Sequence, residues 1–190
     1  MSSHTQTTTK IDIPSPTLVT LPQKFFLGIK RNHVSLVSGN FGEWIQETYR
    51  QAIEAIPQLE YKAQTSIPIA FYHRFGSHED VDLENAIFVD LNELGVSVQQ
   101  VKEKLKELNH NAKNKMEINS IENGEYLTLR FVGPYDMLEQ VWSKFMKSME
   151  ELQYEMAGPC WEEYWNSPTE VKSPNELITV LYQKVAPKKK

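Results

Sequence analysis

The sequence offers few groups for covalent or metal chemistry. Cys160 is its single cysteine, so an intrachain disulfide and a thiolate metal cluster are both excluded. It contains no glycine-rich phosphate loop, no His-Glu-x-x-His motif and no nucleophile elbow. His73, His78, Glu79 and Asp80 match no established ligand spacing, so a solvated turn is the better interpretation there. We therefore predict neither a metal site nor a cofactor.

Long apolar runs and an excess of positive charge are also missing. No run approaches the roughly 20 apolar residues that span a bilayer, and Met1 to Lys10 lacks the apolar core of a signal peptide. The net charge is −5, which argues against a dominant interaction with nucleic acid. By elimination we predict a cytoplasmic protein that binds neither membranes nor nucleic acid directly.

The remaining composition is that of a folded protein, with 40% hydrophobic and 11% aromatic residues in a chain of 190. This length suits one substantial domain, or two small halves that share a sheet. Residues 1–16 are rich in Ser, Thr and Pro and are predicted to be a disordered leader. The folded part is predicted at 17–186, followed by a basic tail at 187–190.

Two parts of the chain show the same order of predicted elements, which we interpret as a duplication. Repeat one (about 20–92) contains an alternating strand at 33–38, a helix at 41–56 that Pro57 ends, and strands at 67–72 and 86–91. Repeat two (about 117–186) contains a strand at 125–132, a helix at 138–152, and strands at 159–166 and 177–182. A connector helix is predicted between them at about 96–109.

This element order predicts an α+β fold. Each strand–helix–strand–strand unit forms an antiparallel sheet with its helix on one face. Two such units that pair edge to edge bury two strand edges and form a concave sheet. The groove between the repeats, on the face opposite the helices, is where a ligand is expected.

The densest chemistry lies in the segment Pro159–Pro168, where acids alternate with aromatic residues. Along a strand, Glu162 and Tyr164 share one face, while Trp161, Glu163 and Trp165 share the other. One glutamate should therefore point into the groove, and the other toward the helix side or its wet rim. A carboxylate among aromatic rings suits a lipophilic cation, and burial makes it usable as a general acid or base. The alternative is that both glutamates are solvated and the tryptophans are packing residues.

Two further aromatic residues are candidate walls of the groove. Tyr72 lies on the strand of repeat one that corresponds to the Glu162 strand, and Tyr135 opens the second helix. Trp44 and Trp142 occupy core positions on their predicted helices and are interpreted as packing residues.

Three segments together resemble the GyrI-like family, the effector-binding domain of many AraC- and MerR-type bacterial regulators. They are Phe131–Leu138, Cys160–Pro168 and Pro174–Tyr182. The resemblance implies the duplicated fold, and its aromatic-Glu-x-Tyr motif falls on Trp161, Glu162 and Tyr164, with Glu162 facing the ligand. Glu163 departs from the family pattern, because it places an acid on the strand face that should be apolar. It is therefore the alternative to Glu162 as the ligand-facing glutamate.

The resemblance suggests a free-standing member with a small-molecule ligand, because no helix-turn-helix domain precedes residue 20. The leading hypothesis is the binding of a lipophilic, cationic or aromatic compound, with Glu162 as anchor and Tyr164, Trp161, Tyr135 and Tyr72 as walls. The first alternative is a hydrolase of electrophilic compounds in which Glu162 and Tyr164 are catalytic. The second alternative is an inhibitor module that binds a protein partner.

Overall fold

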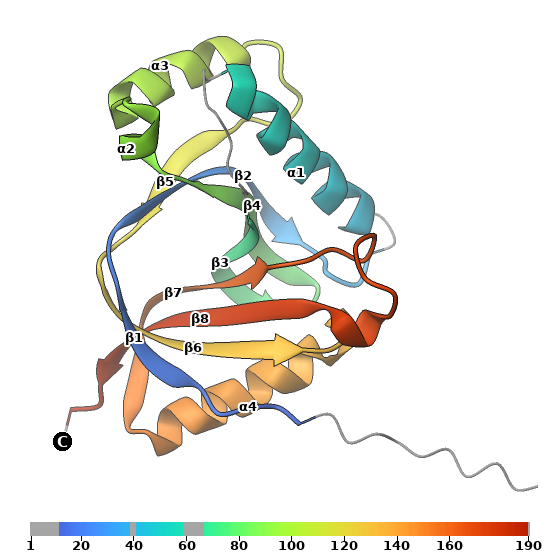
Figure 1. Cartoon of the computed structure of the whole chain (residues 1–190), viewed down its shortest axis with the longest axis vertical. Coiled ribbons are helices and arrows are strands. Elements are labelled where there is room, and N and C mark those ends of the chain that lie inside the picture. The colour runs from blue at the N-terminus through green and yellow to red at the C-terminus, as the bar shows by residue number, and fades with distance from the viewer. Residues whose placement is uncertain (1–11, 39–40, 59–66, 190) are drawn as a thin grey trace, which may run out of the picture.

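The computed structural model describes residues 12–38, 41–58 and 67–189 (Figure 1). The predicted leader therefore falls mainly outside the described residues; in its last part, Ile13 packs against the cluster beneath α4. No helix in the described ranges is long and apolar enough to cross a membrane. The strands are β1 (Thr17–Leu21), β2 (Lys24–Val34), β3 (Pro68–Ser77), β4 (Asp80–Val89), β5 (Glu117–Ile121), β6 (Gly124–Val132), β7 (Tyr154–Tyr164) and β8 (Ile178–Pro187). The helices are α1 (Phe41–Gln58), α2 (Leu91–Leu94), α3 (Val98–Leu108) and α4 (Leu138–Glu151), with short 3₁₀ turns at Tyr135–Met137 and Pro174–Glu176.

All eight strands form one antiparallel sheet in the order β1-β6-β8-β7-β3-β4-β2-β5. Its middle is the β3–β7 pair, which joins β2-α1-β3-β4 to β6-α4-β7-β8. The predicted α+β class and the duplicated strand–helix–strand–strand order are therefore confirmed.

The register of the central pair relates the two repeats residue by residue. The pairs Tyr72–Cys160 and Ala70–Glu162 flank the Phe71–Trp161 pair symmetrically. Tyr72 lies two residues from Ala70, the partner of Glu162, so it shares the face of the sheet on which Glu162 lies.

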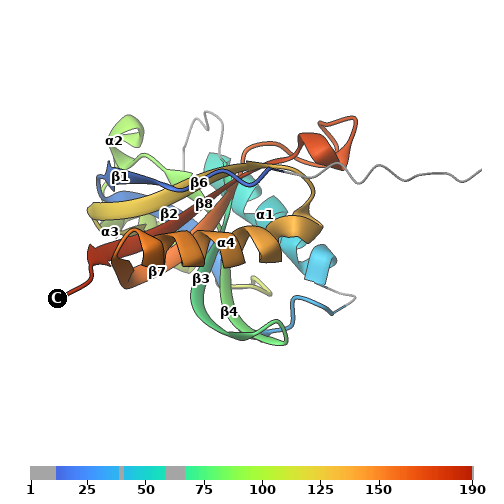
Figure 2. The same ribbon diagram turned by 90° about the horizontal axis from the view of Figure 1, so that it is seen from below.

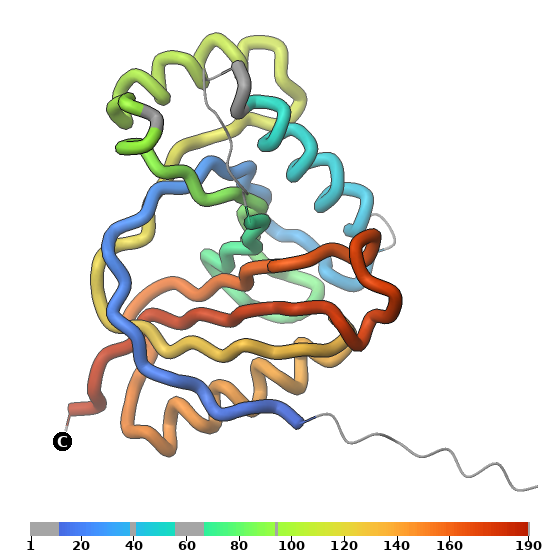
Figure 3. Tube along the Cα trace, in the orientation of Figure 1, coloured from blue at the N-terminus to red at the C-terminus, as the bar shows by residue number. Residues whose placement is uncertain are grey.

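Strands β1 and β5 were not predicted, and they complete the sheet by exchange between the repeats. β1 directly precedes β2 but pairs with β6, whereas β5 directly precedes β6 but pairs with β2. Figure 3 shows the N-terminal blue strand running beside the yellow β6 segment. Each repeat therefore covers the long edge strand of the other, and the edges of the sheet become two strands of only five residues.

The first predicted strand was wrong in position. β2 ends at Val34, and the alternating residues predicted at 33–38 form its end and a turn. The backbone breaks register between Arg31 and Val34, where His33 has a φ of 55°. Residues 26–29 are buried on both faces of the sheet, so this part of the strand has a continuous apolar pattern instead of an alternating one.

The sheet curls toward the face that carries Trp161, which we call the inner face. The Trp161 ring lies 5.2 Å from Tyr126 and 6.3 Å from Phe88, although both residues are two strands away from β7. Flat sheets separate such strands by about 9–10 Å, so the rings converge because the sheet bends. An aromatic and aliphatic cluster fills this face: Phe26, Ile69, Phe71, Ala86, Ile121, Tyr126 and Trp161.

The helices cover the opposite, outer face. α1 packs over β2 and β4 through Leu27, Ile29 and Ile87, while Val141, Phe145 and Met149 of α4 pack over β6 and β8. Figure 2 shows α4 crossing in front of the strands. α3 occupies the predicted connector and begins with a capping box between Ser97 and Gln100.

Candidate ligand-binding site around Glu162

Glu162 lies at the centre of the sheet and points to the outer face, beneath the helices. Its strand neighbour across the repeat boundary is Ala70, and its side chain is only 2% exposed. The expectation that Glu162 faces a groove on the side opposite the helices is therefore wrong, since its side chain lies on the helix side. The inner face cannot provide an open groove at this position, because the side chain of Trp161 fills it and is fully buried.

Three side chains from three different elements donate hydrogen bonds to the Glu162 carboxylate. The indole N–H of Trp142 on α4 lies 2.5 Å from Oε1. The hydroxyl groups of Tyr164 and Tyr72 lie 2.5 Å and 3.2 Å from Oε2. Tyr164 follows Glu162 by two residues on the same strand face, and Tyr72 reaches it from the neighbouring strand β3, two residues beyond its partner Ala70.

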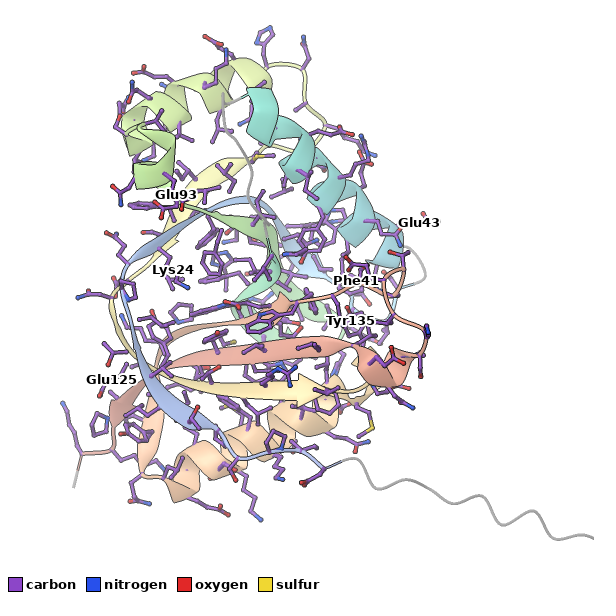
Figure 4. The ribbon with its side chains drawn as sticks, viewed as in Figure 1. Lys24, Phe41, Glu43, Glu93, Glu125 and Tyr135 are labelled. Atoms are coloured by element: carbon purple, nitrogen blue, oxygen red, sulfur yellow. The ribbon has the colours of Figure 1, made fainter. Side chains whose placement is uncertain are left out.

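More aromatic rings surround these donors. Tyr135 stands edge-on to Tyr164 with 5.5 Å between ring centroids, and Trp142 stands edge-on to Tyr72 at 6.5 Å. Tyr49 of α1 donates its hydroxyl to the carbonyl oxygen of Ile69, at 2.7 Å. In Figure 4, Tyr135 lies toward the end of the molecule where Phe41 begins α1. The carboxylate is thus enclosed by aromatic residues of both repeats.

Burial dominates the electrostatics of the site. It raises the pKa of Glu162, and the hydrogen bonds from Tyr164, Trp142 and Tyr72 offset only part of that effect. Burial, and then the negative field of Glu162, raises the pKa of the Tyr49, Tyr72 and Tyr164 hydroxyls well above the usual value. These hydroxyls therefore stay protonated. Those of Tyr72 and Tyr164 donate to the carboxylate, and that of Tyr49 donates to the carbonyl oxygen of Ile69.

No positive charge balances Glu162 within the described part of the chain. The ion pairs of the structure involve other carboxylates, and no Lys, Arg or His is paired with this one. A buried charge without a counterion is costly, and neutral hydrogen-bond donors compensate for it only in part. The site therefore has the electrostatic character of a receptor for a cation or a proton.

The structure brings together four of the five residues singled out in the sequence. Glu162, Tyr164 and Tyr72 form one hydrogen-bonded group, and Tyr135 contacts it through Tyr164. Trp161 does not join them, because it projects to the inner face and stacks against Tyr182 at 4.7 Å.

Glu163 also lies on the inner face. Its carboxylate is 6% exposed and accepts the indole N–H groups of Trp161 at 3.4 Å and Trp165 at 3.0 Å. The two neighbouring glutamates are thus on opposite sides of the sheet, each bound by indole donors. Of the two, only Glu162 lies between the helices.

Trp142 is the site residue that sequence reasoning missed. Its helical spacing with Val141 and Phe145 is typical of a packing residue, and its ring does contact Phe145 at 5.3 Å. Only the position of α4 over β7 brings the indole N–H to Glu162, and the sequence carries no local signal for that placement.

A second group of acids lies at the exposed end of the β3–β4 hairpin. His33, Asp80 and Asp82 offer ligand atoms within 4.8 Å of one another. Arg74, however, binds Asp80 at 2.6 Å and Asp82 at 3.1 Å, and His33 binds Asp80 at 2.7 Å. The oxygens that a metal would need are already used in an ion-pair network, so this group serves to fasten the hairpin.

A curled duplicated sheet with a buried carboxylate between its helices defines a small-molecule-binding class of domain. Residues 14–185 match the family described as the GyrI-like small molecule binding domain, and the chain belongs to this family. The family expected from the motifs around Gly133, Glu162 and Leu177 is therefore confirmed. A comparison with curated proteins found no match in sequence.

Solved structures of low sequence identity share the fold. EcmrR in a complex with DNA superimposes with a TM-score of 0.68 at 15% identity; the match covers 92% of this chain and 58% of that one. A hydrolase from Listeria innocua gives a TM-score of 0.63 at 13% identity, covering 90% and 92% of the two chains. SAV2435 bound to tetraphenylphosphonium gives 0.59 at 15% identity, covering 91% and 94%.

Proposed function

We propose that this protein binds a lipophilic aromatic cation, with the ionised Glu162 as the countercharge. The observation that carries this proposal is a carboxylate that is 2% exposed and enclosed by tyrosine and tryptophan rings, with no cationic partner among the described residues. Aromatic faces attract cations, and a nearby carboxylate adds charge attraction in a low-dielectric setting. The similarity to SAV2435, which was solved with the lipophilic cation tetraphenylphosphonium, supports this class of ligand.

Binding at Glu162 requires a side chain to move. Trp142 is the half-buried donor that closes the site from the helix side, and its bond to Oε1 would break when a cation takes its place. The indole would then contribute its ring face to the wall instead of its N–H. Tyr164 and Tyr72 hold the other oxygen, so the carboxylate stays oriented while the cation enters.

The test is a calorimetric titration with tetraphenylphosphonium of the unmodified protein, Glu162→Gln and Glu163→Gln. Removing one partner of a buried charge pair costs about 2–5 kcal/mol, so Glu162→Gln should lose roughly thirtyfold to several-thousandfold in affinity. Glu163→Gln is the matched control, because it makes the same change on the opposite face. It should leave the affinity within a few fold. Equal affinity of all three proteins, or equal loss in both variants, would reject Glu162 as the countercharge.

A second candidate function is hydrolysis of an electrophilic compound at the same carboxylate. It is favoured by the raised pKa of Glu162, which suits a general base, and by the protonated Tyr164 hydroxyl 2.5 Å away. In such a reaction Glu162 would take a proton from water while the water oxygen bonds to the electrophilic carbon. The bond from that carbon to the leaving oxygen would break, and the Tyr164 hydroxyl would give its proton to this oxygen and regain one from Glu162. Mass spectrometry of mixtures with epoxides and activated esters distinguishes the two functions. A diol heavier than its epoxide by one water, or an acid and an alcohol from an ester, support hydrolysis if they disappear in Glu162→Gln, and unchanged compounds support binding alone.

A further inference from the structure

A pocket of about 360 Å³ lies on the inner face, away from Glu162. Its walls come from β6, β7 and β8, and the chain segment around Pro14 and Thr17 that leads into β1 closes one side. The lining side chains of the sheet are Thr128, Arg130, Trp165, Val180 and Tyr182. This volume is within the range of small-molecule sites, about 300–1,000 Å³.

The strand register explains why these side chains converge. Thr128 pairs with Tyr182 and Arg130 pairs with Val180, so the four alternate along β6 and β8 on one face. Tyr182 pairs with Trp161, which fixes this face as the inner one. Trp165 lies directly beyond the end of β7 and is 49% exposed. The pocket therefore has a flat aromatic and aliphatic floor with polar groups along β6.

Arg130 and Thr128 offer hydrogen-bond donors to the pocket, whereas the Tyr182 hydroxyl already interacts with the carboxylate of Glu163. Arg130 makes no ion pair with any acid in the described part of the chain. The Thr128 hydroxyl is buried without a hydrogen bond of good geometry. Burial first, and then Glu163, raises the pKa of the Tyr182 hydroxyl to about 12, while the nearby Thr128 hydroxyl acts in the opposite direction. Tyr182 is therefore protonated at physiological pH.

Glu163 lies near this pocket, where it interacts with the hydroxyl of the lining residue Tyr182. Glu163 pairs with Val180 in the sheet, but it does not line the pocket. Its two oxygens accept the indole N–H groups of Trp161 and Trp165. The Trp165 ring thus stands between this carboxylate and the pocket, with its N–H turned toward Glu163.

We propose that this pocket is a second binding site, independent of Glu162, for a flat aromatic molecule that carries one carboxylate. The guanidinium of Arg130 would pair with the carboxylate, and the Thr128 hydroxyl would add a donor. The ring would lie against Trp165, Tyr182 and Val180, where offset or edge-on aromatic contacts are favourable. The two sites lie on opposite faces of one sheet and take ligands of opposite charge.

Benzoate is the probe, with benzamide as a neutral molecule of the same shape. Two-dimensional NMR resolves the indole N–H signals, and loss of one signal in Trp165→Phe assigns that residue. Benzoate should shift the Trp165 signal and leave the Trp142 signal in place. Benzamide should bind at least about tenfold more weakly, because it cannot form the charge-assisted contact with Arg130.

Arg130→Gln should weaken benzoate binding by about tenfold or more and leave benzamide binding unchanged. Arg31→Gln is the matched control, because Arg31 is an exposed arginine that lies over the Trp44 ring, away from this pocket. Glu162→Gln should also leave benzoate binding unchanged, which separates this proposal from the cation site. Absence of a benzoate shift at Trp165, equal binding of benzoate and benzamide, or undiminished binding to Arg130→Gln would each overturn the proposal.

Discussion

Replacing Trp142 with Phe separates the two roles of this side chain. The change keeps an aromatic ring beside Tyr72 and Phe145 but removes the N–H that lies 2.5 Å from Glu162 Oε1. A hydrogen bond to a charged group contributes about 1.5–3 kcal/mol. At a pH above the raised pKa of Glu162, the free energy of unfolding should therefore fall by about that amount.

The affinity for tetraphenylphosphonium should change in the opposite direction. In the unmodified protein, the cation must break the bond between Trp142 and Glu162 before it can use the carboxylate. The variant has no such bond, so the affinity should rise by about tenfold to a hundredfold, the binding equivalent of 1.5–3 kcal/mol. Calorimetric titration measures the affinity, and urea unfolding measures the stability.

Trp165→Phe is the control for this experiment. It also removes an indole N–H from a glutamate, at 3.0 Å from Glu163, but on the inner face. Its affinity for the cation should be unchanged. If Trp142→Phe binds the cation no better than the unmodified protein does, the indole N–H does not compete with the ligand and the reasoning is refuted.

Two further predictions concern pH and packing. Burial raises the pKa of Glu162, and only its ionised form attracts a cation, so the affinity for tetraphenylphosphonium should rise as pH increases through that pKa and then level off. The affinity of Glu162→Gln should not depend on pH in this way. A pH-independent affinity of the unmodified protein would contradict the prediction. The same raised pKa means that the contribution of Glu162 to stability is greatest below its unfolded pKa and is lost as pH rises through the folded value. Gly28→Ala should lower the free energy of unfolding by about 1–3 kcal/mol, because its Cβ would lie 2.2 Å from Glu84, which is fully buried and binds His73 and Asn119. Gly42→Ala, which meets no atom within 4 Å, is the control in the same urea measurement.

The sequence predicts the repeats well because helices and central strands carry strong periodic signals. The apolar spacing of α4 and the Gly133-Pro134 break before it are local features, and the structure has a helix where they predict one. β1 and β5 are only five residues long and pair with residues 89 to 111 positions away, such as Leu18 with Leu127 (127 − 18 = 109). Their pairing depends on the tertiary fold, so it cannot be predicted from a local sequence pattern.

In the candidate site, too, local features could be predicted from the sequence and tertiary ones could not. Alternation along β7 predicts that Glu162 and Tyr164 lie on the face opposite Trp161, and in the structure they do; Tyr72 donates a hydrogen bond to Glu162 from β3. Which face the helices cover cannot be deduced from that alternation, because both faces of β7 carry buried aromatic and acidic residues. The role of Trp142 depends on how a helix lies across a strand, which is set by packing over the whole sheet.

The exchange of β1 and β5 has a consequence for the order of events during synthesis. When repeat one leaves the ribosome, the outer edge of β2 has no partner until residues 117–121 have been made, and β1 has none until residues 124–132 follow. At about 5–20 residues per second, the nascent first half spends several seconds with open strand edges. During that time the N-terminal half exposes unpaired strand edges, which can pair with other chains and so favour aggregation.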